Sequence, residues 1–247
     1  MMTPIGLQEF AEETRAAKTV RELWILFRTY LESWSIPLVS YHHGAAGAPP
    51  AKKDGIFAVA GFPKAWTDEY IEADLARVDP IPELALRTVS PFFWSDTPKL
   101  MRLIPEQTAY LKKLFASGVG DGIAVQVFGP KLRNGYVGLG FGGAKRPMKG
   151  SELRELQASC QIAHLRYCEL TEGDEREAQP LSMREREILH WVARGKSNAV
   201  IGDILGLSSH TVDAYLRRVY AKLEVSDRTS AAIRGVGSGL VLGVHAL

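Results

Sequence analysis

The segment that most constrains the fold is a stretch of ten residues without a large apolar side chain. Residues 171–180 read TEGDEREAQP, so the segment is highly charged and ends in proline. Such a segment contributes nothing to a hydrophobic core and is typical of a linker between separately folded units. We therefore predict one domain at 1–170, a linker at 171–180 and a second domain at 181–247.

Positive charge gathers in the second predicted domain. The whole chain is nearly neutral, with a formal net charge of +2. After Pro180, however, nine basic residues stand against six acidic ones, which gives +3 there and −1 for the first 180 residues. This excess favours a polyanion such as DNA as the partner of the second domain.

The composition excludes two classes of protein. A hydrophobic fraction of 46% is too high for a disordered chain, and no stretch reaches the roughly 18 apolar residues that a membrane span needs. The two cysteines, Cys160 and Cys168, lie eight residues apart on one expected helix, too far along its axis for a disulfide. Without an export signal at the N-terminus, we expect a cytoplasmic protein with no membrane partner.

The first 170 residues alternate between helical and strand patterns. The helical stretches are 7–34 as one or two helices, Lys64–Val78, Pro82–Thr88, Pro105–Ser117, and Ser151–Glu169 with Ser151 as N-cap. Strand patterns occupy Pro37–Tyr41, Gly55–Ala60, Gly122–Phe128 and Tyr136–Phe141. This order predicts an α+β protein whose N-terminal domain is an α/β/α sandwich with a mostly antiparallel sheet.

The last 67 residues predict an all-α domain of four helices. Serines precede the first three as N-caps: Ser182, in a capping box with Glu185, Ser197 and Ser208. We expect Val200 to be buried, and a fourth helix around Ala231–Val236 to be broken by glycines. The second and third helices, joined at Gly206, form a helix-turn-helix.

The third helix of this domain has a polar face that suits the major groove of DNA. Its side chains offer donors to phosphates and groups that can contact base edges. The candidate DNA-binding residues are Lys196, Ser197, Ser209, His210, Thr211, Asp213, Ala214, Arg217 and Arg218. The alternative is a helical bundle whose polar face is only solvated. Two half-sites require two chains, and we expect the Ser151–Glu169 helix to form the homodimer interface.

The second domain resembles the DNA-binding domain of the LuxR family. The matching pattern is LSxRExEIL from Leu181, GKSx3I from Gly195, LSx2TV from Leu207 and KLxVx2R from Lys222, about 48 residues without a gap. Val200 replaces an acidic residue usual in the family. Gly202 replaces an alanine, which should loosen the second helix by roughly 0.5–1 kcal/mol. The pattern of a phosphorelay receiver does not precede this domain.

The first domain is similar to the autoinducer-binding domain of quorum-sensing LuxR-type regulators. The pattern is FPx2Wx3Yx8DP from Phe62, followed by PFxW and Gx3G. The resemblance implies that Trp66 donates to the lactone carbonyl of an acyl-homoserine lactone, that Asp79 accepts from the ligand amide, and that Tyr70 and Trp94 form walls. It further implies a ligand-responsive transcriptional regulator that binds a palindromic operator as a dimer and has RNA polymerase as a partner.

Departures from this family pattern concern the acyl group. Phe62 lacks the hydroxyl of the tyrosine that many members have, and Phe141 stands near a position that is often Thr or Ser. Gly138, Gly140 and Gly142 leave one face of a strand bare, where a bulky group or a backbone could approach. We expect Phe62 and Phe141 to contact the ligand, and the ligand to carry a branched or aromatic acyl group or to be less necessary than usual.

Two other interpretations stay open. From spacing alone, Trp66, Tyr70 and Trp94 are aromatic core, and Asp79 only caps the segment after Pro80. The rival function is a ligand-independent DNA-binding regulator whose first domain only dimerises or binds an unrelated small molecule.

The sequence does not point to an enzyme. No nucleophile, base and orienting group form a set, so we predict no catalytic residue and no cofactor. Gly138–Gly143 fits GxGxxG, but other residues separate it from the next helix, which the nucleotide-binding motif does not allow. His42 and His43 are neighbours on a strand and point to opposite faces, so we predict no metal site.

Overall fold

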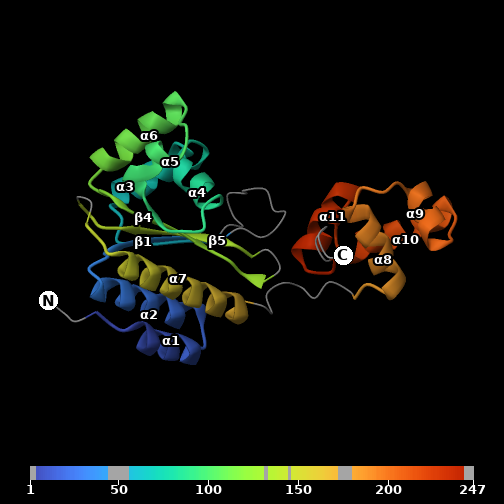
Figure 1. Cartoon of the computed structure of the whole chain (residues 1–247), viewed down its shortest axis with the longest axis horizontal. Coiled ribbons are helices and arrows are strands. Elements are labelled where there is room, and N and C mark those ends of the chain that lie inside the picture. The colour runs from blue at the N-terminus through green and yellow to red at the C-terminus, as the bar shows by residue number, and fades with distance from the viewer. Residues whose placement is uncertain (1–3, 44–55, 131–132, 144–145, 172–179, 242–247) are drawn as a thin grey trace. The chain divides into compact units, whose positions relative to one another are not determined.

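The computed structural model of the chain describes residues 4–43, 56–130, 133–143, 146–171 and 180–241 (Figure 1). Contacts divide the chain into two compact units. The first contains nearly all described residues up to Leu170, and the second contains those from Thr171 onward. Most of the predicted linker, residues 172–179, lies outside the described residues.

The first unit contains seven α-helices and five strands among its described residues. The helices are α1 Leu7–Ala16, α2 Val20–Ser33, α3 Lys64–Glu72, α4 Pro80–Ala85, α5 Thr97–Leu100, α6 Pro105–Ala116 and α7 Gly150–Leu170. The strands are β1 Leu38–His43, β2 Ile56–Ala60, β3 Phe92–Phe93, β4 Gly122–Val127 and β5 Gly135–Gly140. Two short 3-10 turns are η1 Leu75–Arg77 and η2 Trp94–Asp96.

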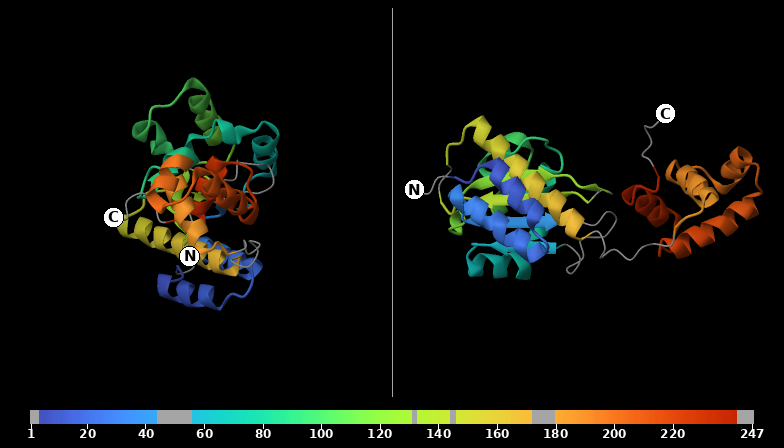
Figure 2. Two further views of the ribbon diagram at one scale, coloured as in Figure 1. Left: turned by 90° about the vertical axis from the view of Figure 1, so that its right-hand side faces the viewer. Right: turned by 90° about the horizontal axis from the view of Figure 1, so that it is seen from below.

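The strands form one sheet in the order β2-β1-β5-β4-β3, and neighbouring strands are antiparallel. Helices α1, α2 and α7 cover one face, and α3 to α6 cover the other, as Figures 1 and 2 show. The predicted α/β/α sandwich is therefore confirmed. Its sheet is antiparallel because β1 and β2, and likewise β4 and β5, follow one another without a crossover helix.

Side-chain alternation gives the two faces of this sheet different roles. On β1, Val39 and Tyr41 belong to the hydrophobic core under α2 and α7. The alternate residues of β1, Ser40 and His42, point to the opposite face, where they line a cavity. On β5, Val137 joins the helical core and Tyr136 faces the cavity.

Two boundary predictions in this unit are wrong. The helix expected at Lys64–Val78 ends at Glu72, because Asp74 takes a left-handed conformation with φ 50° before η1. Ser151 does not cap the long helix, which begins at Gly150; the Lys149 N–H instead bonds Glu152 at 2.6 Å. The pair Phe92–Phe93, for which no element was predicted, adds a short strand to β4.

The second unit consists of α8 Met183–Ala193, α9 Asn198–Leu205, α10 Ser209–Lys222 and α11 Arg228–Gly237 (Figure 1). Ser182, Ser197 and Ser208 accept the predicted capping bonds from Glu185, Val200 and Thr211. Between α9 and α10 the chain turns at Gly206, whose φ of 66° ends α9.

Two packing predictions for this unit are wrong. Val200 is 40% exposed, because Ile201 faces the core and its neighbour is rotated away by about 100° on the helix. Helix α11 continues through Gly235 and is not broken by it. A Cβ on Gly235 would come within 2.8 Å of Leu189, so the glycine allows α11 to approach α8 closely.

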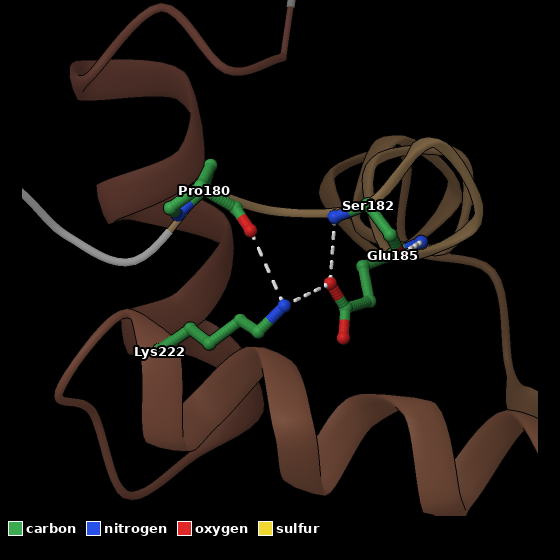
Figure 3. A network of polar contacts seen from close by, with 4 residues as sticks. All are labelled: Pro180, Ser182, Glu185 and Lys222. Atoms are coloured by element: carbon green, nitrogen blue, oxygen red, sulfur yellow. Dashed lines mark hydrogen bonds and ion pairs between the residues drawn. The ribbon is translucent and has the colours of Figure 1, made fainter.

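A buried carboxylate joins the start of α8 to the end of α10, as Figure 3 shows. Glu185 is 3% exposed and accepts from Ser182 N at 2.7 Å and from Lys222 Nζ at 2.8 Å. The Lys222 ammonium also donates to Pro180 O at 3.2 Å. Burial acts to raise the pKa of Glu185, but the hydrogen bonds from Lys222 and Ser182 together hold this pKa below its ordinary value.

We expect Glu185→Gln to lower the free energy of unfolding of the second unit by about 1.5–3 kcal/mol, because it weakens hydrogen bonds to a charged group. Native-state hydrogen exchange of the α8 and α10 amides in the full chain measures the loss. Since the folded-state pKa lies below 4.5, this stabilisation is complete above pH 4.5 and disappears as pH falls through the lower value.

The matched control is Glu187→Gln. Glu187 pairs with Arg184 at 2.7 Å, but both side chains are well exposed, so its loss should change stability by less than about 1 kcal/mol. Equal losses in the two variants would contradict a structural role for the Glu185 network.

Candidate functional site

A cavity lies against the sheet face that α3, α4 and α6 cover. Its volume is about 490 Å³, open space at the mouth included. Its lining is mainly aromatic and aliphatic with a few polar groups, as in many small-molecule sites. The lining residues are Ser40, His42, Val59, Phe62, Trp66, Thr67, Tyr70, Asp79, Ile81, Trp94, Tyr110, Leu114 and Tyr136.

The carboxylate of Asp79 is the polar centre of this cavity. Its Oδ1 caps α4 by accepting from Ile81 N at 2.9 Å. Its Oδ2 accepts from the hydroxyls of Tyr110 at 2.9 Å and Tyr70 at 3.1 Å. A carboxylate has about four lone-pair positions, so these three bonds leave room for one more donor.

Surrounding protein atoms raise the pKa of the Asp79 carboxyl. Removal from bulk water raises the pKa of Asp79 from 3.8 to about 6, although the hydrogen bonds from Ile81, Tyr110 and Tyr70 oppose the rise. Burial, followed by the negative charge of Asp79, raises the pKa of both Tyr70 and Tyr110. Both tyrosines are therefore neutral donors at neutral pH.

Trp66 and Tyr70 lie one turn apart on α3 and both face the cavity. Their ring centroids are 6.3 Å apart, and the Trp66 and Tyr110 centroids are 6.1 Å apart. The Trp66 indole N–H makes no hydrogen bond to another described residue. The same cavity is therefore lined by the Trp66 N–H, which has no partner among the described residues, and by Asp79, which can accept one more hydrogen bond.

The bare glycine face of β5 is occupied by the indole of Trp94. A Cβ on Gly122 would lie 2.7 Å from this ring, and one on Gly140 would lie 3.2 Å from it. The backbone directly after Trp94 is held by Asp121, which accepts from Ser95 N at 3.0 Å and from Ser95 Oγ at 2.7 Å. The space expected for a bulky group is thus used by the protein's own side chain.

The structure brings five of the six predicted ligand-binding residues together. Phe62, Trp66, Tyr70, Asp79 and Trp94 all line the cavity. Phe141 does not: it contacts the core under α2 and α7, with its ring centroid 6.3 Å from that of Phe93. The alternation along β5 already indicated this, because Leu139 and Phe141 follow the face of Val137.

Sequence reasoning missed five polar residues of the cavity: Ser40, His42, Thr67, Tyr110 and Tyr136. Three of them could have been found from strand alternation, since they share a sheet face with Gly138. The ring centroids of His42 and Tyr136 are 5.1 Å apart. Burial lowers the pKa of His42 to about 4, so its imidazole is neutral at pH 7.

In the second unit, the predicted DNA-binding residues share an exposed surface at α10 and the start of α9. Ser209, His210, Arg217 and Arg218 are exposed, as are Lys196 and Ser197, while Thr211, Asp213 and Ala214 are half-buried. Arg217 pairs with Asp213 at 2.7 Å. Arg218 lies over the Tyr215 ring at 4.9 Å and makes no ion pair with a described residue.

The segment before α9 is held by Arg228 from the start of α11. Its guanidinium donates to the Lys196 carbonyl and, at 2.9 Å, to Asn198 Oδ1. Ser197 accepts from Val200 N at 3.4 Å. These contacts fix the exposed amides at the N-terminus of α9, a position suited to a phosphate.

Two further properties bear on function. Among the described residues, no three His, Cys, Asp or Glu side chains gather as they would around a metal ion. In the same part of the chain, no helix combines the length and apolarity that crossing a membrane requires.

Comparison with known proteins finds two families in the chain. The autoinducer binding domain family matches residues 19–167, and the family of bacterial regulatory proteins called luxR matches residues 179–234. The quorum sensing-dependent transcriptional regulator RpaR of Rhodopseudomonas palustris is 28% identical over 73% of each chain. The transcriptional activator AhyR of Aeromonas hydrophila is 29% identical over 73% of this chain and 71% of its own.

The fold has a close counterpart among solved structures. SdiA of Escherichia coli superposes with a TM-score of 0.73 over 96% of this chain and 98% of its own, at 20% identity. These relatives are transcriptional regulators and not enzymes. The chain belongs to the LuxR family and is a quorum-sensing transcriptional regulator with an autoinducer-binding domain and a DNA-binding domain.

Proposed function

We propose that the cavity binds an N-acyl-homoserine lactone-like signal. The observation that carries this proposal is that one mainly apolar cavity contains both the Trp66 N–H, which makes no hydrogen bond to another described residue, and the Asp79 carboxylate. A lactone carbonyl needs a donor, an amide N–H needs an acceptor, and an acyl tail needs apolar walls. Trp66 and Asp79 supply the first two, and Phe62, Tyr70 and Trp94 form walls.

Relatives support a small-molecule signal of this kind. RpaR is described as quorum sensing-dependent, and SdiA has been solved in complex with octanoyl-rac-glycerol. In this chain the sheet face that α3, α4 and α6 cover carries the cavity with Asp79 at its centre. The acyl group has to fit beside Trp94, which fills the glycine face of β5.

We further propose that the protein binds a palindromic operator as a homodimer. Residues 1–170 would bind ligand and dimerise through α7, and residues 181–247 would bind DNA, with 171–180 as the linker. Helix α10 would enter the major groove, while Lys196 and Ser197 contact phosphate. RNA polymerase is the expected further partner of a regulator bound beside a promoter.

One observation favours the ligand-independent alternative. Tyr70, Tyr110 and Ile81 already supply Asp79 with three hydrogen bonds, so most of its acceptor positions are occupied without a ligand. In that alternative the first domain only dimerises, or it binds an unrelated small molecule. A lactone titration distinguishes the two functions.

We expect N-octanoyl-homoserine lactone to raise the melting temperature of the full chain, with about 2.7 kcal/mol of stabilisation at a hundredfold excess over Kd. Trp66→Phe should weaken binding about tenfold, because the lactone carbonyl loses its donor. Isothermal titration measures both affinities. The control Trp24→Phe, which changes a ring in the helical core on the other sheet face, should bind like the wild type.

The alternative predicts a different result. If straight-chain, branched and aromatic acyl-homoserine lactones all leave the melting temperature unchanged, the regulator is ligand-independent or binds another molecule.

For DNA, we expect Arg218→Ala to weaken binding of the full chain to a random-sequence duplex. The slope of log K against log salt should become shallower by about one, since one phosphate contact is lost. Fluorescence anisotropy across a salt series, with and without lactone, measures this slope. Arg15→Ala, a change in α1 of the first unit, should leave the slope as it is. If the slope of Arg218→Ala equals that of the wild type, Arg218 does not contact a phosphate.

A further inference from the structure

A second cavity lies on the sheet face that α2 and α7 cover. Its volume is about 480 Å³, open space at the mouth included. Helix α2 contributes Trp24 and Phe27 to the lining, α7 contributes Ala163 and Tyr167, and β1, β2 and β5 also line the space. Protein interiors are close-packed and contain few voids larger than a water molecule. A space of this size inside the domain is therefore large enough to receive a ligand.

The sheet separates this second cavity from the first one. On β2, Val59 lines the first cavity and Ala58 lines the second. On β5, Tyr136 lines the first cavity and Val137 lines the second. Successive side chains of a strand point to opposite faces, so the two spaces lie back to back with the backbone between them. The second cavity is thus a separate site, and two molecules can occupy both cavities at once.

The walls of the second cavity lie inside the domain. Phe27, Ala163 and Tyr167 are each less than 9% exposed. Exposure rises only on α2, where Val20 is 39% exposed and Trp24, one turn further along, is half-buried. We place the mouth at these two residues. A protein partner binds through exposed side chains over a broad surface, whereas buried walls behind a small mouth suit a small molecule.

The polar groups at this cavity are engaged with one another. The Tyr41 hydroxyl and His164 Nδ1 share a hydrogen bond at 2.8 Å, and His164 Nε2 lies 3.6 Å from Cys168 Sγ. Burial raises the pKa of the Cys160 thiol, which is therefore neutral at pH 7. None of the described lining residues is Asp, Glu, Lys or Arg. A charged ligand would lose its water without gaining a counter-charge, so the cavity favours a neutral one.

We propose that the cavity between α2, α7 and the sheet is a second ligand site, for a small, neutral and almost wholly apolar molecule. Aromatic rings supply much of its wall. The ring centroids of Trp24 and Phe27 are 6.3 Å apart, and those of Tyr41 and Tyr167 are 5.3 Å apart. Affinity would come from the removal of apolar surface from water. The inference goes beyond the proposed function and does not depend on a lactone in the first cavity.

Two fluorescent probes with the same ring skeleton test the chemistry of the site. N-phenyl-1-naphthylamine is neutral, and anilinonaphthalene sulfonate carries one negative charge. Both become brighter in apolar surroundings, so their affinities are measured by fluorescence titration of the purified full chain. We expect the neutral probe to bind at least about tenfold more tightly, because the sulfonate would be buried without a counter-charge. Equal affinities, or no binding of the neutral probe, would overturn the proposal.

Two variants fill the cavity from different elements. Ala163→Leu adds carbon atoms from α7, and Ala58→Leu adds them from β2. Each should weaken binding of the neutral probe about tenfold, because the added side chain occupies the ligand's space. The same carbons enter space that is already open, so the melting temperature should be unchanged or higher. This second measurement separates a filled site from a damaged fold.

Two controls locate the probe. Ala158→Leu makes the same change on α7 at a half-buried position that lines neither cavity. Val59→Phe fills the first cavity from the residue next to Ala58. Both variants should bind the neutral probe like the wild type. If Val59→Phe weakens binding while Ala163→Leu and Ala58→Leu do not, the probe occupies the first cavity and the second site is refuted.

Discussion

The first unit depends on one carboxylate shared by three helices. Asp79 caps α4, receives a hydroxyl from α3 through Tyr70 and receives another from α6 through Tyr110. These helices cover the cavity face of the sheet, so the bonds that brace them also define the shape of the cavity. Because protein atoms surround the carboxyl, its ionised form needs these donors. A ligand N–H would occupy the one lone-pair position of Asp79 that the donors of the protein leave open.

The sheet beneath contributes space as well as side chains. Gly122 and Gly140 receive the Trp94 indole, and Gly138 leaves room for two hydroxyls. A β-carbon at any of these positions would press on a ring or on a polar group. These glycines thus determine the position of the Trp94 ring and the places where polar atoms face the cavity. In the second unit, Gly235 similarly allows α11 to approach α8.

Much of the fold could be predicted because its signals are local. The caps Ser182, Ser197 and Ser208 lie where their spacing indicated, since each needs only the next three residues. The role of Gly235 depends on a tertiary contact with Leu189, and no local pattern marks it. The site divides in the same way. Trp66 and Tyr70 follow from helical spacing, whereas Tyr110, 31 residues from Asp79, joins them only through folding.

The central claim is that Asp79 both braces the cavity and accepts the N–H of the signal. The most direct measurement is the affinity for N-octanoyl-homoserine lactone between pH 5 and pH 7. A ligand that donates to Asp79 favours its ionised form, so affinity should fall as the pH drops below about 6, where the free carboxyl takes up a proton. Asp79→Asn should bind more weakly and without this dependence. A wild-type affinity that is constant across the range, or the same slope in the variant, would contradict the account.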